Sequence, residues 1–229
     1  MDIILYVLAG LSVAFGLVTA VLYTTNKPGR AFVTKLAGST AFIAAGIVAL
    51  SMTFYDKTAG AIIVIAMLFS FWGDFFLARK EMPKLGGTDN FLWGVVSFAV
   101  SQTLFIIGYL MLSGYDFNYF TLFLLLAAVV PLIVGKLTKM FKFKGNEFVL
   151  SLIYGLFLCA TLAVNVSYFI SDGGDGALVA MIASIMFLVS DFSLGLYFFS
   201  SMKHKKLFNY PIMIFYFGAE VLYALSLVM

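Results

Sequence analysis

Three acidic residues lie within long apolar stretches of the sequence, where charged side chains are rare. Asp74 and Asp191 share one pattern, a small residue, Asp, Phe, any residue and Leu, written GDFFL and SDFSL, and Glu220 lies in the last apolar stretch. A carboxylate at membrane depth costs several kcal/mol unless it is paired or hydrated, so each is a candidate functional residue. The alternative is that each only makes a hydrogen bond between helices.

Two carboxyl groups in an apolar site suit acid catalysis. Burial favours the protonated form, and a second carboxylate nearby lets one acid keep its proton while the other stays ionised. Such a pair serves reactions with an oxocarbenium-like transition state, as in glycosidases. A vinyl ether needs the same treatment: protonation of the outer alkene carbon, addition of water, and collapse of the hemiacetal to an aldehyde and an alcohol.

The composition requires a membrane. Of 229 residues, 63% are hydrophobic and only 11% are charged, against roughly 45–50% and about 25% in soluble domains. A small soluble fold could not hide this much apolar surface. The composition excludes a soluble globular domain, a disordered tail and a nucleic-acid binder, and it predicts one transmembrane domain over residues 1–229.

The apolar stretches predict an all-α bundle of eight transmembrane helices, each near the roughly 20 residues that a bilayer core needs. Pro131 is expected to kink or end the fifth helix. The first stretch does not resemble a cleavable signal, because no basic leader precedes it. The predicted spans are residues 3–23, 33–52, 60–78, 91–112, 119–135, 148–170, 177–199 and 208–228.

The basic residues predict the orientation. Every Lys and Arg except Lys57 flanks the first, third, fifth or seventh connection, whereas the opposite side carries Asp2, Asp56, Asp116, Asp172 and Asp175. By the positive-inside rule, both termini lie outside and the basic connections face the cytoplasm. We therefore expect a multi-pass integral protein, of the inner membrane if the source is bacterial.

The two Asp patterns suggest a repeat. They lie on the predicted third and seventh helices, which run in the same direction, as expected for a parallel four-plus-four repeat. Pseudo-twofold packing would bring both acids to one cavity near the basic end. Ser70, one turn before Asp74, shares its helix face.

Several other chemistries lack the residues they need. His204 is the only histidine, which argues against a zinc hydrolase or a serine hydrolase, and it is expected to be solvated. Cys159 has no basic neighbour in its span, and no Lys lies deep in a late span to bind retinal. The surroundings of Asp74 and Asp191 depart from the intramembrane aspartyl proteases. We expect no metal and no cofactor.

The chain resembles the YhhN family of eight-helix membrane proteins. The resemblance rests on Gly73-Asp74-x-x-Leu77 with Phe91-x-x-Gly94-x-x-x-Phe98, on FLVSDFSL at 187–194, and on Tyr216 with ALS at 224–226. Animal members are lysoplasmalogenases, which cleave the vinyl ether of lysoplasmalogens to a fatty aldehyde and glycerophosphoethanolamine or glycerophosphocholine. The resemblance implies that Asp74 and Asp191 are the catalytic pair and that Lys35 binds the phosphate. Family members commonly carry His where Gln102 stands and Gln where Glu220 stands.

The sequence thus predicts a lipid hydrolase whose substrate is a lysophospholipid that enters from the cytoplasmic leaflet. Membrane lipids would surround the protein. Either aspartate could be the general acid, and Lys35, Arg79 or Lys203 would neutralise the phosphate. The alternatives are a proton-coupled transporter and a lipid-binding or scaffold protein. The predicted catalytic residues are Asp74 and Asp191, and the predicted substrate-binding residues are Lys35, Ser70, Gln102, Tyr154, Ser190, Tyr216 and Glu220.

Overall fold

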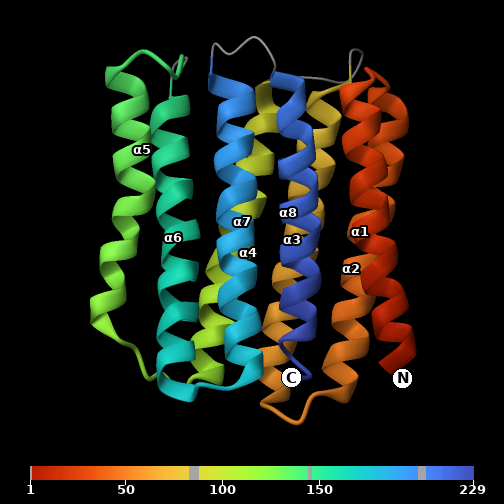
Figure 1. The fold of residues 1–229 in the computed structure, drawn as a ribbon, viewed down its shortest axis with the longest axis vertical. Helices are drawn as coiled ribbons and strands as arrows, with labels where there is room; N and C mark the ends of the chain where they lie inside the picture. The colour runs from red at the N-terminus through yellow and green to blue at the C-terminus, as the bar shows by residue number, and fades with distance from the viewer. Residues whose placement is uncertain (1, 83–87, 144–145, 201–204) are drawn as a thin grey trace.

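The computed structural model describes residues 2–82, 88–143, 146–200 and 205–229. Over these residues it contains eight helices long and apolar enough to cross a membrane, so the predicted all-α, eight-helix architecture is confirmed (Figure 1). The helices are α1 (Asp2–Thr24), α2 (Pro28–Met52), α3 (Lys57–Lys80), α4 (Thr88–Leu112), α5 (Leu126–Leu137), α6 (Glu147–Asp172), α7 (Asp175–Phe199) and α8 (Asn209–Leu225), with the 3-10 segments η1 (Tyr119–Leu125) before α5 and η2 (Lys205–Phe208) before α8.

The helices end where local chemistry stops them. Asp56 begins α3 by accepting a hydrogen bond from the backbone N–H of Thr58, at 2.7 Å, and Pro28 occupies the first turn of α2. Gly173 ends α6 in the left-handed conformation, with φ of 68°. An α-helix pairs its backbone groups within its own segment, which a bilayer interior demands.

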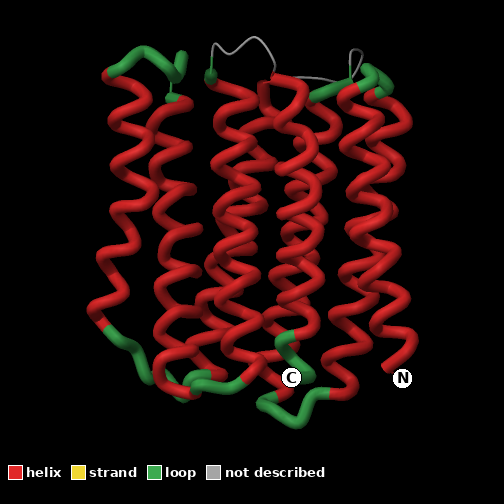
Figure 2. Tube along the Cα trace, viewed as in Figure 1, coloured by secondary structure: helices red, strands yellow, loops and turns green. Residues whose placement is uncertain are grey.

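The described residues nearest both termini lie at one end of the bundle, and the last residues of α1, α3, α5 and α7 lie at the other (Figures 1 and 2). We call this second end the basic end, because all Lys and Arg residues except Lys57 flank the connections on this side. The alternation expected from the charges is therefore present in the fold. That the basic end faces the cytoplasm stays a prediction.

Helix α8 lies at the centre of the packing. It packs against α1, α2, α3 and α7, and its span is the most buried of the eight, at 56%. Small residues let neighbouring helices approach closely. A Cβ atom on Gly73 would lie 2.5 Å from the ring of Phe98, so this glycine lets α4 press an aromatic ring against α3.

Helix α5 stands at the edge of the bundle, against α6 and η1 (Figure 1). Of the two alternatives expected for Pro131, a kink or an end of the fifth helix, the second is wrong, because α5 continues past this residue to Leu137. The irregular part of this span is instead its first third, which forms the 3-10 segment η1. Only 12% of the span is buried, so few neighbours constrain its backbone.

The predicted four-plus-four repeat stays a prediction. Helix α3 packs most extensively against α4, and α7 packs most extensively against α8. This correspondence is what a repeat of helix pairs predicts. Within the described residues, however, the backbones of α3 and α7 do not approach each other closely. This separation determines how the two aspartates are arranged.

Candidate functional site

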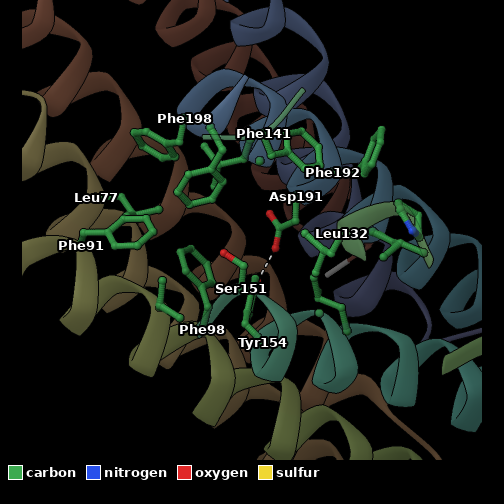
Figure 3. A pocket seen from close by; sticks show the side chains of 18 residues that line it. Leu77, Phe91, Phe98, Leu132, Phe141, Ser151, Tyr154, Asp191, Phe192 and Phe198 are labelled. Atoms are coloured by element: carbon green, nitrogen blue, oxygen red, sulfur yellow. Dashed lines mark hydrogen bonds between the residues drawn. The ribbon is translucent and has the colours of Figure 1, made fainter. Parts of the chain in front are cut away.

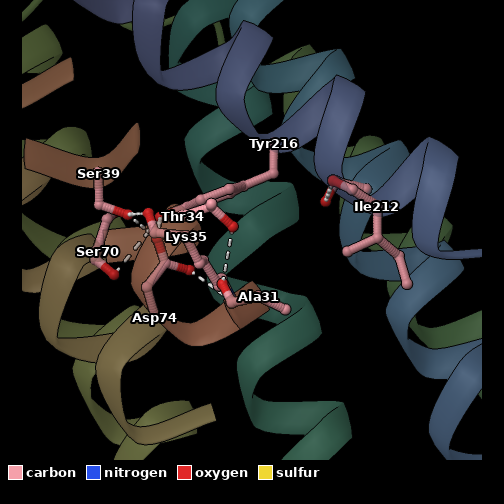
Figure 4. Close-up of polar contacts among 9 residues, drawn as sticks. Ala31, Thr34, Lys35, Ser39, Ser70, Asp74, Ile212 and Tyr216 are labelled. Atoms are coloured by element: carbon pink, nitrogen blue, oxygen red, sulfur yellow. Dashed lines mark hydrogen bonds and ion pairs between the residues drawn. The ribbon is translucent and has the colours of Figure 1, made fainter. Parts of the chain in front are cut away.

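Asp74 is the centre of a buried ionic network joining α2, α3 and α8 (Figure 4). The ammonium of Lys35 lies 2.9 Å from Asp74 Oδ1. The hydroxyls of Ser39 and Tyr216 donate to Oδ2, at 2.5 and 2.7 Å. Asp74 is 1% exposed and Lys35 6%. An ammonium and two hydroxyl donors are partners that suit an ionised carboxylate, so these three contacts favour the anionic form of Asp74.

Helix geometry explains how this network forms. Lys35 and Ser39 are one turn apart on α2, and Ser39 also donates to the Lys35 carbonyl, at 3.0 Å. Both side chains therefore reach the same carboxylate from one helix face. A buried charge pair of this kind tolerates poorly the loss of one partner, because the remaining charge cannot return to water.

Asp191 lies in a different environment, on the wall of a cavity of about 120 Å³ (Figure 3). The hydroxyl of Tyr154 donates a hydrogen bond to Asp191 Oδ2. The rest of the wall is almost entirely apolar, with Ser151 as a further polar group beside Tyr154 and Asp191 (Figure 3). The aromatic and aliphatic side chains of this wall come from α3 to α7 and include Leu77, Phe91, Phe98, Pro131, Leu132, Phe141, Leu158, Leu188, Phe192 and Phe198.

The connection between α5 and α6 closes part of this cavity at the basic end. The backbone N–H of Lys142 donates to the carbonyl of Phe199 at the end of α7, at 2.8 Å. This bond holds Phe141 against the cavity, whose wall it joins. The chain that follows the otherwise loosely packed α5 is thereby joined to the end of α7.

The prediction that both aspartates line one shared cavity is wrong. Asp74 lines neither the cavity at Asp191 nor a smaller cavity next to it. The ring of Phe98 lies between the two sites, 6.5 Å from the ring of Tyr154 and 5.9 Å from that of Tyr216. Asp74 and Lys35 nevertheless lie within electrostatic range of Asp191. The acids thus form neighbouring sites with different partners.

A second cavity, of about 30 Å³, lies beside the first toward the basic end. Leu77, Leu194 and Phe198 line both cavities and so form the partition between them. Its polar lining comes from five residues of α1, α2, the end of α3, α7 and α8, namely Tyr23, Lys35, Glu81, Tyr197 and Asn209. The cavity therefore offers both a cation and an anion beside the Asp191 site.

Glu81 and Asn209 were missed by the sequence analysis. Burial raises the pKa of the Glu81 carboxyl, although Lys80 and Lys35 nearby act to lower it. The Asn209 Nδ2 atom is buried, with no hydrogen-bond partner in the described part of the chain, and so can donate to a ligand. Neither residue stands out in the sequence, because Glu81 lies in a basic connection and Asn209 beside one.

The remaining predicted residues occupy several places. Ser190 donates to the carbonyl of Ile212, at 2.9 Å, and so joins α7 to α8. Ser70 shares a hydrogen bond with Ser101, at 2.8 Å. Gln102 and Glu220 are fully buried. Lys203, predicted as a phosphate ligand, and His204 lie outside the described residues.

Fold and site together define a multi-pass helical membrane protein with a buried ion pair beside an acid-lined apolar cavity. The chain belongs to the YhhN family, whose sequence profile matches residues 31–227. No curated protein and no solved structure matches the chain. The family match includes Lys35, Asp74, Asp191 and Glu220.

Proposed function

We propose that this protein is a membrane-embedded hydrolase that cleaves the vinyl ether of lysoplasmalogens to a fatty aldehyde and a glycerophospho head group. The observation that carries the proposal is the position of Asp191, the only acidic group on the wall of an otherwise apolar cavity within the described residues. A polar cavity containing Lys35 lies next to it. Membership of the YhhN family, with its resemblance to lysoplasmalogenases, supports the same assignment.

An amphiphilic substrate would bind with its apolar chain in the larger cavity and its head group in the smaller, polar cavity. The first carbons of the alkenyl chain would lie among the rings around Asp191, and the phosphate would bind Lys35 and the free Nδ2 of Asn209. Glu81, Tyr23 and Tyr197 would surround the ammonium of an ethanolamine or choline head group. The vinyl ether, which lies between chain and head group, would then cross the partition formed by Leu77, Leu194 and Phe198.

The chemistry needs one acid that is protonated when the substrate arrives, and Asp191 suits this role. Its carboxyl group would transfer a proton to the outer alkene carbon, leaving an oxocarbenium ion and the Asp191 carboxylate. The carboxylate would then take a proton from the water that attacks the oxocarbenium carbon. The hemiacetal collapses by breaking its bond to the glycerol oxygen, which receives a proton, and an aldehyde is released.

Asp74 would act differently, as a positioning residue. Its carboxylate is occupied by Lys35, Ser39 and Tyr216, so it is not free to donate a proton. It would hold the Lys35 ammonium at the edge of the second cavity, where the phosphate is expected. Its negative charge, close to Asp191, would also favour the positive oxocarbenium ion.

The proposal is tested with purified protein in vesicles and two matched lipids. We expect aldehyde release from an alkenyl lysophospholipid, and none from the saturated alkyl ether with the same chain and head group, because only the vinyl ether forms the oxocarbenium ion on protonation. Absence of aldehyde from the alkenyl lipid would overturn the proposal. Counterflow of a solute without any product would replace it with transport.

A side chain added inside the larger cavity should block the substrate without harming the fold. Gly195 lies one turn after Asp191 and lines this cavity, and a Cβ atom there would meet nothing within 4 Å. We expect Gly195→Leu to lower aldehyde release at least tenfold while thermal unfolding is unchanged, because the side chain takes the place of the lipid chain. Gly10→Leu on α1, where a Cβ is equally free of contacts, is the control and should be fully active. Equal activity of both variants would contradict this placement of the chain.

Glu81 should discriminate head groups. We expect Glu81→Gln to raise the KM for ethanolamine and choline substrates about fivefold, equivalent to about 1 kcal/mol for a partly exposed charge pair. A substrate that ends in a bare phosphate should be unaffected. Because burial raises the pKa of Glu81, the preference for an amine should fall as the pH is lowered and the carboxylate gains a proton. Asp116→Asn, at an exposed acid at the opposite end, is the control. An equal rise in KM for the phosphate-only lipid would contradict this role.

A further inference from the structure

Helices α4 and α8 face each other across the bundle in a constant register. The ring of Phe98 lies 5.9 Å from that of Tyr216, and the ring of Phe105 lies 4.2 Å from that of Tyr223. One turn further, the hydroxyl of Tyr109 is 2.8 Å from that of Ser226. These contacts follow one another in the same order along both helices. The two helices therefore run in the same direction, and their facing residues keep a nearly constant offset in the sequence.

This register places Gln102 opposite Glu220. Gln102 comes four residues after Phe98 and three before Phe105, and Glu220 comes four after Tyr216 and three before Tyr223. Spacings of three and four residues return to the same helix face. Both side chains are fully buried, so they project into the same layer of the interior.

Neither side chain has its polar atoms fully satisfied. Both amide atoms of Gln102 are buried without a hydrogen-bond partner among the described residues, and Glu220 has only the hydroxyl of Ser70 nearby, outside good hydrogen-bond geometry. A bare carboxylate at this depth would cost several kcal/mol or more. Lys35, the one buried Lys or Arg in the described part of the chain, is already paired with Asp74. No buried Lys or Arg among the described residues is therefore left to neutralise a Glu220 carboxylate, and a proton bound to Glu220 makes this carboxyl group neutral.

Two side chains connect this layer to Asp74. Ser70 lies close to Glu220 and shares a hydrogen bond with Ser101, the neighbour of Gln102. Tyr216, one turn before Glu220, donates to Asp74 Oδ2, at 2.7 Å. We propose that Glu220 and Gln102 form a proton-binding site in the middle of the bundle, in which the carboxyl O–H of Glu220 donates to the Gln102 amide oxygen directly or through a water. Ser70 and Tyr216 link this site to the Asp74 network.

The titratable groups around Glu220 are few. Asp74 faces it from α3 and is paired with Lys35 of α2, and Asp191 faces it from α7. Tyr216 and Tyr223 lie one turn away on α8 itself, and Tyr109 and Tyr154 lie on α4 and α6. On α1 the described tyrosines lie toward the two ends of the helix. The site does not depend on the proposed hydrolase activity, because no substrate group enters the argument.

Infrared spectroscopy of the protein in lipid nanodiscs tests the site directly. The wild type should show the carbonyl band of a protonated carboxyl group that is lost in Glu220→Gln. Raising the pH should remove this proton and leave a buried charge, so the wild type should lose thermal stability at alkaline pH more steeply than Glu220→Gln. An unchanged band in Glu220→Gln, or the same pH dependence in both proteins, would overturn the proposal.

Exchanging the two side chains gives a matched control. The double variant Gln102→Glu/Glu220→Gln keeps one carboxyl and one amide in the same layer and should recover both the band and the alkaline loss of stability. Failure to recover them in a folded double variant would refute the pairing. If Glu220→Gln does not fold, Gln102→Leu serves instead, because it keeps the carboxyl group and removes its acceptor. The band should then move to higher frequency, and a band at the wild-type frequency would contradict the pairing.

Discussion

Asp191→Asn should abolish aldehyde release while leaving the bundle folded. Asparagine has nearly the same size and can still accept the hydrogen bond from Tyr154, but it cannot donate a proton to carbon. General acid–base catalysis contributes about 100- to 10,000-fold to a rate, and we expect a loss in this range. Aldehyde released from an alkenyl lysophospholipid in vesicles is the measurement, with thermal unfolding as the check on the fold.

The control for this variant is Asp116→Asn, which removes an exposed carboxylate at the end of the bundle opposite the cavities. It should keep wild-type activity. If Asp191→Asn retains more than about a tenth of the wild-type rate, another group supplies the proton. The proposed role of Asp191 would then fail, although the family assignment would stand.

The Lys35–Asp74 pair should show the largest effect on stability. Breaking a buried ion pair on one side costs about 3–5 kcal/mol, because the remaining charge is left without a partner. We therefore expect Asp74→Asn and Lys35→Met each to lower the unfolding midpoint sharply. The double variant Lys35→Met/Asp74→Asn, which buries no charge at this position, should recover most of the loss. The unfolding midpoints of the four proteins in the same detergent form a double-mutant cycle that measures the coupling.

Activity separates the two roles of this pair. The double variant should be stable yet nearly inactive, because it lacks the ammonium that would bind the phosphate. Single variants as stable as the wild type would show that the pair is not buried as described. Wild-type activity in the stable double variant would remove Lys35 from the substrate site.

The architecture could be predicted from the sequence because a bilayer imposes strong constraints on it. Apolar length determines where spans lie, and the alternation of basic connections determines their number. The helices extend a few residues beyond the predicted spans at most ends, as in α3, which begins at Lys57 and ends at Lys80. Capping residues such as Asp56 set these helix ends, and a hydropathy pattern does not identify capping residues.

The arrangement of the site could be predicted only in part. Asp74, Lys35 and Tyr216 were each expected to be functional, but periodicity gives the face of a helix and not the neighbour that the face meets. The structure shows that α2 and α8 supply the partners of Asp74. It also shows that Phe98 fills the space through which the two aspartates were expected to meet. Such a ring differs little in sequence from the many other Phe residues of the chain.

Isotope incorporation tests the central claim most directly. In heavy water the Asp191 carboxyl exchanges its proton for deuterium, so the acid step should place one deuterium on the carbon next to the aldehyde group. Mass spectrometry of the aldehyde released by the wild type should show this single label, after subtraction of the exchange seen with unlabelled aldehyde incubated alone. Aldehyde released without that deuterium, or labelled and released at the same rate by Asp191→Asn, would contradict acid-catalysed cleavage at this cavity.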